Sequence, residues 1–335
     1  MKEILLRLAW KFGGFAPFRL ANRRRALVLT YHRFSADGAD RTTSAEMFEW
    51  QLHYLTRRYQ VVPLSLIADC LAQRRELPSR AVAITIDDGY RDAFEIAFPL
   101  LRKYHAPATL FAVTDFTDQK IWLWPDKARF ICLHTSSQNS EITLGGEQRR
   151  MNLTDHEARL QAADRINDAL KLLPTDEREA RLSRIATMLK VALPALPPPD
   201  YSAATWEQLR EMAAAGIEIG SHTVTHPILT TLEPAQLDAE LRESRARLTA
   251  GLHREVKLFC YPNGDSDRRV RAAAGRAGYQ CAATCEPGLI EQNSPLLALP
   301  RIHTERDPAH FAQSTSGFEL RKNRLRNALR PALSG

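Results

Sequence analysis

The sequence predicts an α/β protein built as a barrel of about seven parallel strands with helices on the outside. Short apolar runs rich in β-branched residues alternate with longer segments whose apolar residues have helical spacing. Several of these runs end in polar residues or glycine, as strands do at the rim that carries the active site of such barrels. The chain has 335 residues, 44% of them hydrophobic, which suits one barrel domain with an insertion.

The first part of the chain alternates strictly between the two patterns. Its β-branched runs are short enough for buried strands of a parallel sheet. The expected elements are, in order, a strand at 26–31, a helix at 45–58, a short strand at 60–63, a helix at 64–73, a strand within 81–89, a helix at 91–104 and a strand at 107–113.

This alternation stops near Asp115 and resumes at Trp206. Residues 155–190 are rich in Ala, Leu, Arg and Glu and are typical of one or two helices. Pro194 and Pro197–Pro199 then indicate a stiff connection. We interpret residues 116–204 as a helical insertion that shapes one wall of the cleft. A packing appendage without substrate contact is the alternative, and its histidines, His134 and His156, are expected at the surface.

The second part of the chain returns to the alternating pattern. The expected elements are a helix at 205–215, a strand within 218–226, a helix at 234–250, a strand at 256–261, a helix at 267–277, a strand at 279–284, a last apolar element at 296–303 and a basic helical tail over 306–335. The organisation is therefore an N-terminal segment at 1–25, the barrel domain at 26–305 and the tail.

Two adjacent carboxylates, Asp87 and Asp88, follow the strand that begins at Ala81. Successive strand side chains point to opposite faces, so both can reach one site only where the strand gives way to a turn. Gly89 indicates such a turn, because glycine accepts a positive φ. The C-terminal ends of strands are where α/β folds place their active sites. A helix N-cap is the alternative interpretation of the pair.

Two histidines favour the active-site interpretation. His222 and His226 follow a second short strand, and on a helical turn residues four apart share a face. Two imidazoles and one carboxylate make three protein ligands. A catalytic zinc takes three and keeps one position open for water.

These residues carry a resemblance to a known family. Thr85–Gly89 resembles the Thr-Phe-Asp-Asp-Gly motif of the polysaccharide deacetylases, also called the NodB-homology family or carbohydrate esterase family four, and Ser221–His226 resembles their His-[Ser/Thr]-x-x-His motif. The resemblance covers roughly residues 26–305. It implies a distorted seven-stranded barrel and a metal-dependent hydrolase that removes N-acetyl groups from an N-acetylated sugar in a polysaccharide or glycan precursor.

The resemblance also implies roles for individual residues. Asp88, His222 and His226 would hold a divalent metal, with zinc the first choice, and Asp87 would be the general base. The turn at Tyr261–Gly264 would help to hold the oxyanion, with the Asn263 backbone N–H as donor and Tyr261 beside it.

One motif departs from the family pattern. The usual Arg-x-Pro-Tyr, whose Arg orients the base, is replaced here by a segment with Cys260 at the Arg position. Arg301 is the candidate substitute.

The general acid has two candidates. His303 follows an apolar run near the C-terminal end of the domain, as in the usual order of the family. His32 follows the strand at 26–31, and Leu29–His32 resembles the permuted order of the poly-N-acetylglucosamine deacetylases. We favour His32, because His303 follows Pro300, where the strand pattern is broken.

The net charge of +7 restricts the classes of binding partner that we expect. The basic residues at the ends are Arg19, Arg23, Arg24, Arg25, Arg321, Lys322, Arg324, Arg326 and Arg330. No nucleic-acid-binding signature accompanies them, so we expect no nucleic acid partner. Anionic lipid or an acidic polysaccharide fits better, and a solvated basic surface remains an alternative. The five cysteines show no disulfide framework, and Cys281 and Cys285 lack the partner pair of a zinc site.

The N-terminal segment is predicted to be an amphipathic helix. Glu3, Arg7 and Lys11 form one charged stripe, and the residues between them are mostly apolar. Such a helix can lie in an anionic membrane interface or dock on its own domain. The charges interrupt any signal-peptide core, and no apolar run is long enough to span a membrane. We therefore expect a cytoplasmic protein that is peripheral to the inner membrane.

Two other functions stay open. A binding module that has lost catalysis would lack at least one metal ligand, and all three are present. A hydrolase of the same fold that acts on non-sugar C–N bonds is compatible with the same residues. The identity of the glycan and the oligomeric state cannot be inferred from these motifs.

Overall fold

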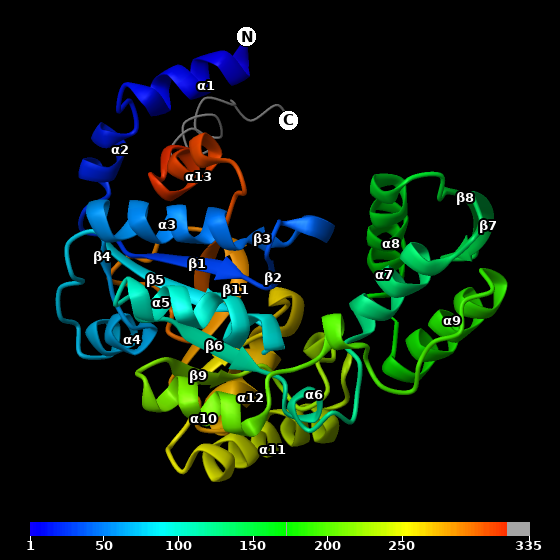
Figure 1. The fold of residues 1–335 in the computed structure, drawn as a ribbon. Helices are drawn as coiled ribbons and strands as arrows, with labels where there is room; N and C mark the ends of the chain where they lie inside the picture. Colours follow the sequence, from blue (N-terminus) through cyan, green and yellow to red (C-terminus); the bar gives the residue numbers. More distant parts are fainter. Residues whose placement is uncertain (172, 320–335) are drawn as a thin grey trace, which may run out of the picture.

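A closed barrel forms the centre of this computed structural model, which describes residues 1–171 and 173–319 (Figure 1). Within these residues, seven parallel strands follow one another around the ring. They are β1 (Leu27–Tyr31), β12 (Leu299–His303), β11 (Cys281–Pro287), β10 (Leu258–Cys260), β9 (Glu218–Ser221), β6 (Thr109–Ala112) and β5 (Ala81–Ile86), which pairs with β1 again. The short β4 (Gln60–Val61) extends the sheet beside β5. The predicted seven-stranded barrel is confirmed.

The pairing between neighbouring strands is continuous on one side of the barrel and interrupted on the other. β1 and β5 pair continuously from Leu27 opposite Val82 to Tyr31 opposite Ile86. In contrast, β10 meets β9 at the single pair Phe259 and Ser221, and the register between β11 and β12 shifts. These interruptions are the distortion of the barrel.

Helices cover the outside of the ring, and the alternating side chains of β5 illustrate why they pack there. In β5, Val82, Ile84 and Ile86 pack into the core shared with the helices, whereas Ala81 and Ala83 belong to the inner cluster. Small side chains suit the narrow interior. The covering helices are α3 (Ala45–Arg58), the continuous η2 (Ala93–Ala97) and α5 (Phe98–Lys103), α10 (Trp206–Ala214), α11 (Pro234–Leu252) and α12 (Arg268–Arg276). Helix α4 (Leu64–Ala72) instead packs on the inner cluster through Leu64, Ile67 and Leu71.

Most of the segment between β6 and β9 projects sideways from the barrel, whereas its first helix, α6, stays beside α11 (Figure 1). It contains α6 (Thr114–Thr117), α7 (Trp124–His134), the antiparallel hairpin β7 (Asn139–Leu144) and β8 (Glu147–Asn152), α8 (His156–Leu170), α9 (Thr175–Met188) and η3 (Pro199–Tyr201). One or two helices were predicted within 155–190, and the structure has two, α8 and α9. The description of residues 116–204 as a helical insertion is incomplete, because it did not include the hairpin, whose turn uses Gly145 and Gly146 at positive φ. The segment has its own apolar core, which includes Ile131, Ile142 and Leu182.

The strand pattern does not end at Pro300, contrary to the sequence expectation. β12 continues to His303 and pairs with β1 through Leu29 opposite Ile302 and Thr30 opposite His303. Short elements complete the rim. They are β2 (Phe34–Ser35), η1 (Ala39–Arg41), β3 (Thr43–Ser44), η4 (Leu229–Thr231) and η5 (Pro262–Gly264).

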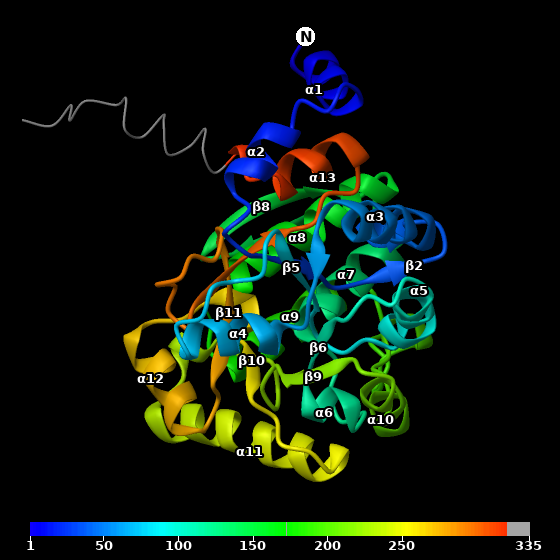
Figure 2. The ribbon, with the colours of Figure 1, turned by 90° about the vertical axis from the view of Figure 1, so that its left-hand side faces the viewer.

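Both ends of the described chain lie on one side of the barrel. α1 (Lys2–Lys11) and α2 (Ala16–Ala21) lie beside α13 (Pro308–Thr315), as both views show (Figures 1 and 2). The basic residues of the predicted tail from Arg321 onward lie outside the described residues. No helix within residues 1–171 or 173–319 is long and apolar enough to cross a membrane.

Candidate active site

Asp87 and Asp88 reach the same cavity because the strand ends between them. Asp87 continues the inner row of β5 beyond Thr85 and is 1% exposed. Asp88 would point the opposite way in a regular strand, but its φ of 75° and the φ of 82° at Gly89 turn the chain. A Cβ on Gly89 would lie 3.2 Å from Ala112 Cα, so this turn favours glycine.

His222 and His226 also converge, but they do not lie on a helical turn as expected. The loop after β9 is irregular, with Thr223 at φ 75° and His226 at φ 58°. Glu240 of α11 holds the loop, because its carboxylate accepts hydrogen bonds from the backbone N–H of Val224 at 2.7 Å and of Thr225 at 3.1 Å. Sequence reasoning missed Glu240, which is a helix residue without a motif.

The three expected metal ligands form a compact cluster. Asp88 Oδ1 lies 3.4 Å from Nε2 of both His222 and His226, and the ligand atoms all lie within 4.8 Å of one another. The His222 Nδ1 atom contacts the Cys260 carbonyl oxygen at 2.7 Å, which favours a proton on Nδ1 and leaves the Nε2 lone pair free. Burial lowers the pKa of His226 to about 4, so its imidazole is neutral. Two imidazole nitrogens and a carboxylate oxygen are ligand types that suit a divalent cation such as zinc.

Arg301 reaches Asp87 from β12, which is separated from β5 by β1 alone. Its Nη1 and Nη2 atoms donate to Asp87 Oδ1 and Oδ2, each at 2.8 Å, and both side chains are almost fully buried. Nε donates to the Thr284 carbonyl at 2.7 Å and Nη1 also donates to Thr85 Oγ1 at 3.0 Å. This bidentate arrangement fixes the plane of the carboxylate.

Cys260 leaves room for this guanidinium. Its Sγ atom lies 3.1 Å from Arg301 Nη2 and 3.6 Å from Asp87 Oδ2. A small side chain on β10 thus allows an arginine on β12 to occupy the space beside the carboxylate. Burial by itself would raise the pKa of Asp87, but the charge and hydrogen bonds of Arg301 outweigh it and hold the pKa well below its ordinary value.

Both candidate acids lie at the same rim, and only one faces the cavity closely. His32 Nε2 lies 3.7 Å from Asp87 Oδ2, and His32 lines the cavity. The His303 ring is parallel to that of His32, with centroids 6.4 Å apart. Burial and the neighbouring His32 and Arg301 lower the pKa of His303.

The turn after β10 separates the two residues expected at the oxyanion. Asn263 lines the cavity at φ 57°, and its backbone N–H donates to no acceptor among the described residues. Tyr261 cannot donate to the oxyanion, so the expectation for this residue is wrong. Its N–H donates to the Ala283 carbonyl at 3.1 Å, its hydroxyl donates to the Leu297 carbonyl at 2.9 Å, and its ring is fully buried.

The inserted segment forms the second wall of the cavity, whose volume is about 320 Å³. Trp124, Asn167 and Lys171 face the metal cluster and the Asp87 carboxylate across it. The expectation that this segment shapes one wall is confirmed. None of these three residues carried a signal in the sequence, because their approach depends on how the segment folds back.

Comparisons with known proteins place the chain among deacetylases. The family described as polysaccharide deacetylase matches residues 74–282. YxkH of Bacillus subtilis (strain 168), a protein named for the same family, is 24% identical over 82% of this chain and 70% of its own length. The poly-beta-1,6-N-acetyl-D-glucosamine N-deacetylase of Escherichia coli O157:H7 is 27% identical over 93% of this chain, which spans 40% of that enzyme.

Solved structures share the fold. The Streptococcus pyogenes deacetylase PplD, in complex with acetate, aligns with a TM-score of 0.59 and 18% identity over 87% of this chain and 98% of that one. IcaB from Ammonifex degensii aligns with a TM-score of 0.54 and 20% identity over 87% of this chain and 97% of that one.

Proposed function

This chain belongs to the polysaccharide deacetylase family, and from that premise we propose that it hydrolyses the N-acetyl group of a sugar residue within a glycan. The observation that carries the proposal is the position of the Asp88, His222 and His226 cluster beside a carboxylate clamped by arginine. The family is metal-dependent, and the cluster has the ligand types for one divalent cation, for which we propose zinc.

When bound, the cation would supply Lewis-acid chemistry, lowering the pKa of a water and polarising the acetyl carbonyl. Asp87 is the proposed general base. Arg301 uses one lone-pair direction on each carboxylate oxygen, so a second direction on each remains for a proton from water. The low pKa keeps Asp87 ionised over the working pH range.

The developing negative charge on the acetyl oxygen needs a donor. We propose the Asn263 backbone N–H, since Tyr261 is engaged with β11 and the Leu297 carbonyl. The Asn263 side chain donates to Asp265 Oδ2 at 2.6 Å, which steadies the turn.

Cleavage of an amide also needs a proton for the leaving amine, and we propose His32 as its donor. Its imidazole is 44% exposed and approaches Asp87 from the open side of the cavity. Histidine suits this task because its ordinary pKa lies near neutral pH.

Acetate release from a panel of substrates tests the proposal. Purified protein loaded with zinc should release acetate from N-acetylglucosamine oligomers and leave small non-sugar amides intact. The reverse preference would support a hydrolase of other C–N bonds. Release from neither, with the metal bound, would support a binding module.

We also propose that α1 binds an anionic membrane surface. Of the nine large hydrophobic side chains exposed among the described residues, seven lie within residues 1–20, including Ile4 at 64%, Leu5 at 60% and Phe12 at 78%. Leu6 and Ala9 pack against the core, so the helix docks by one side and exposes the other. The exposed basic residues around it are Lys2, Arg7, Lys11, Arg23 and Arg24, of which Arg7 is paired with Glu3 and Asp307.

Sedimentation with phosphatidylglycerol vesicles tests this contact. The intact chain should bind at low salt and dissociate as salt rises, because the lipid attraction is partly electrostatic. Changing Ile4, Leu5 and Phe12 together to Ser should abolish binding, while Leu196→Ser, which alters an exposed apolar residue of the inserted segment, should not. Equal binding by all three proteins would refute the proposal.

A further inference from the structure

The imidazole of His32 is not held in place by hydrogen bonds of its own. Its Nε2 atom lies 3.7 Å from Asp87 Oδ2, which is too long for a hydrogen bond. The ring of His303 is parallel to it, but the two centroids are 6.4 Å apart. Within residues 1–171 and 173–319, neither ring nitrogen of His32 forms a hydrogen bond. The position of this imidazole therefore depends on the backbone that carries it.

The backbone on both sides of His32 is fixed. The Tyr31 carbonyl accepts a hydrogen bond from the Asp87 N–H at 2.9 Å, which continues the pairing of β1 with β5. The Arg33 carbonyl accepts a hydrogen bond from the Thr43 N–H at 3.0 Å. Because His32 lies between these two residues, its Cα can move only if one of them moves.

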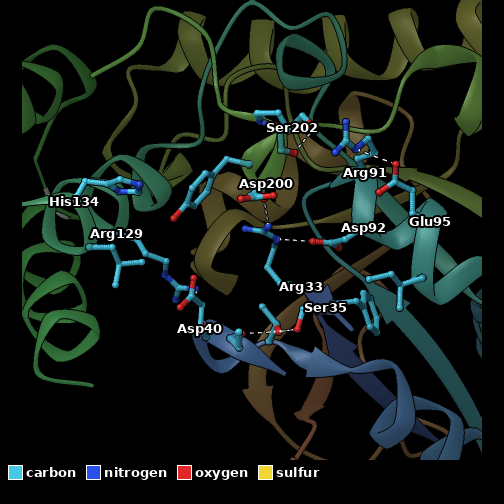
Figure 3. Close-up of a pocket in the computed structure, with 17 residues that line it drawn as sticks. Arg33, Ser35, Asp40, Arg91, Asp92, Glu95, Arg129, His134, Asp200 and Ser202 are labelled. Carbon is cyan, nitrogen blue, oxygen red and sulfur yellow. Dashed lines mark hydrogen bonds and ion pairs between the residues drawn. The ribbon is translucent and has the colours of Figure 1, made fainter. Parts of the chain in front are cut away.

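The side chain of Arg33 is bound to three other parts of the chain. It lines both the catalytic cavity and a second cavity of about 380 Å³ (Figure 3). Its Nε atom donates to Asp92 Oδ2 at 2.7 Å, at the start of η2, and an Nη atom donates to the Asp200 carbonyl at the end of the inserted segment (Figure 3). The guanidinium carbon also lies 4.1 Å from the centre of the Tyr90 ring.

Tyr90 connects this side chain to the turn that carries the two catalytic carboxylates. It directly follows Gly89 in the sequence, and its hydroxyl donates to Asp126 Oδ2 at 2.6 Å. Asp126 Oδ1 lies 3.7 Å from Arg33 Nη1, and both Tyr90 and Asp126 are buried. The loop after β1 and the turn after β5 are thereby held in a fixed relation.

Proton transfer to the leaving amine depends on this relation. As the C–N bond of the amide breaks, the proton of the His32 imidazolium passes to the amine nitrogen. Such a transfer needs donor and acceptor atoms about 2.6–3.2 Å apart. A displacement of about 1 Å is enough to slow a step of this kind about 100-fold.

We infer that Arg33 is a positioning residue, which fixes His32 relative to the turn that carries Asp87. The inserted segment takes part through Asp126 and the Asp200 carbonyl, so it contributes to catalysis as well as forming a wall of the cavity. This inference rests on the proposed function, in which His32 protonates the leaving amine.

Two substrates with different leaving groups test the role of Arg33. An N-acetylglucosamine tetramer needs a proton on its leaving amine, whereas 4-nitrophenyl acetate releases a stable phenolate that needs none. In zinc-loaded protein, Arg33→Met should lower kcat for the tetramer about 100-fold and leave kcat for the aryl ester within about threefold. Arg33→Lys keeps the charge but cannot span the same acceptors, so it should lower kcat for the tetramer only about tenfold.

Two further variants control for general effects on the fold. Arg91→Met is the matched control, because Arg91 lines the second cavity and pairs with the exposed Glu95 at 3.1 Å (Figure 3). It should keep both activities. Asp92→Asn weakens the same hydrogen bond from its other partner and preserves the side-chain shape, so it should lower kcat for the tetramer about tenfold and spare the aryl ester.

A double-mutant cycle identifies the group through which Arg33 acts. Once His32→Ala has removed that group, adding Arg33→Met should cause no further loss on the tetramer. Losses that multiply in the double variant would overturn the inference and leave the proposed function standing. Equal losses on both substrates, or unchanged turnover of the tetramer in both Arg33→Met and Asp92→Asn, would do the same.

Crystal structures of the zinc-loaded wild type and Arg33→Met keep the two proposals separable. The separation of His32 Nε2 and Asp87 Oδ2 should change by at least about 1 Å in the variant, or the imidazole should lose defined density. An unmoved, well-defined His32 would overturn the inference. No acetate release from any glycan by the wild type would refute the proposed function, while the two structures would still decide whether Arg33 fixes His32.

Discussion

Replacing Arg301 with lysine probes how much the bidentate clamp contributes. The guanidinium donates to both oxygens of Asp87 and to the Thr284 carbonyl at once. An ammonium group keeps the charge but places its donors on one nitrogen, so it cannot span all three acceptors. One or two lost charge-assisted hydrogen bonds should lower the free energy of unfolding by about 2–3 kcal/mol. If the transition state is destabilised by the same free energy, kcat falls about 30- to 150-fold.

Replacing Arg301 with methionine removes the cation and changes the pH dependence. In the wild type the lowered pKa of Asp87 means that the ion pair stabilises the fold above the ordinary Asp pKa of about 4. This stabilisation is lost as pH falls through the folded-state pKa. Without the cation, burial raises the pKa of Asp87, and the ionised form becomes an unpaired buried charge. The destabilisation should therefore be about 3–5 kcal/mol at pH 7 and smaller at pH 4.

Urea unfolding of chelator-treated protein at both pH values measures these differences, and acetate release from zinc-loaded protein measures kcat. Moving the arginine from β12 to β10 provides a rescue experiment. Cys260→Arg combined with Arg301→Ala returns an arginine to the position usual in the family, and it should recover part of the activity that Arg301→Ala loses. Arg301→Lys with kcat within threefold of wild type, or a methionine variant equally destabilised at pH 4 and pH 7, would refute this reasoning.

Three further substitutions test the remaining roles. His222→Ala should lose both the bound metal and the activity, and stoichiometric metal retained in this variant would disprove the ligand set. Asp87→Asn should keep the fold and the metal but lose most turnover, because the water is no longer deprotonated; activity within a few-fold of wild type would make Asp87 structural. His32→Ala should keep its metal, lose orders of magnitude in kcat and flatten the alkaline limb of the pH–rate profile, whereas the same pattern in His303→Ala alone would assign the acid to His303.

The barrel was predictable because the patterns that indicate its strands lie within short segments of the sequence. The run from Ala81 to Ile86 is apolar and β-branched, it ends in carboxylates and glycine, and the same pattern recurs along the chain. Parallel strands open on one rim, so Asp88 and the two histidines could be placed together before any distance was known. The family resemblance then supplied the roles.

The remaining features depend on contacts between distant positions. Arg301 could be named only as a candidate, because it is 214 positions from Asp87 and its local sequence does not show that the two side chains meet. The loop after β9 was expected to be helical, because spacing alone cannot show the positive φ at Thr223 and His226. The wall at Trp124 and Lys171 arises from how the inserted segment folds back, which no periodicity records.

Titration of chelator-treated protein with zinc, while acetate release from an N-acetylglucosamine tetramer is followed, tests the central claim most directly. The Asp88, His222 and His226 cluster predicts that activity rises in proportion to bound metal and saturates at one ion per chain, with no response in His222→Ala. Full acetate release by metal-free protein, or saturation that His222→Ala does not alter, would contradict it.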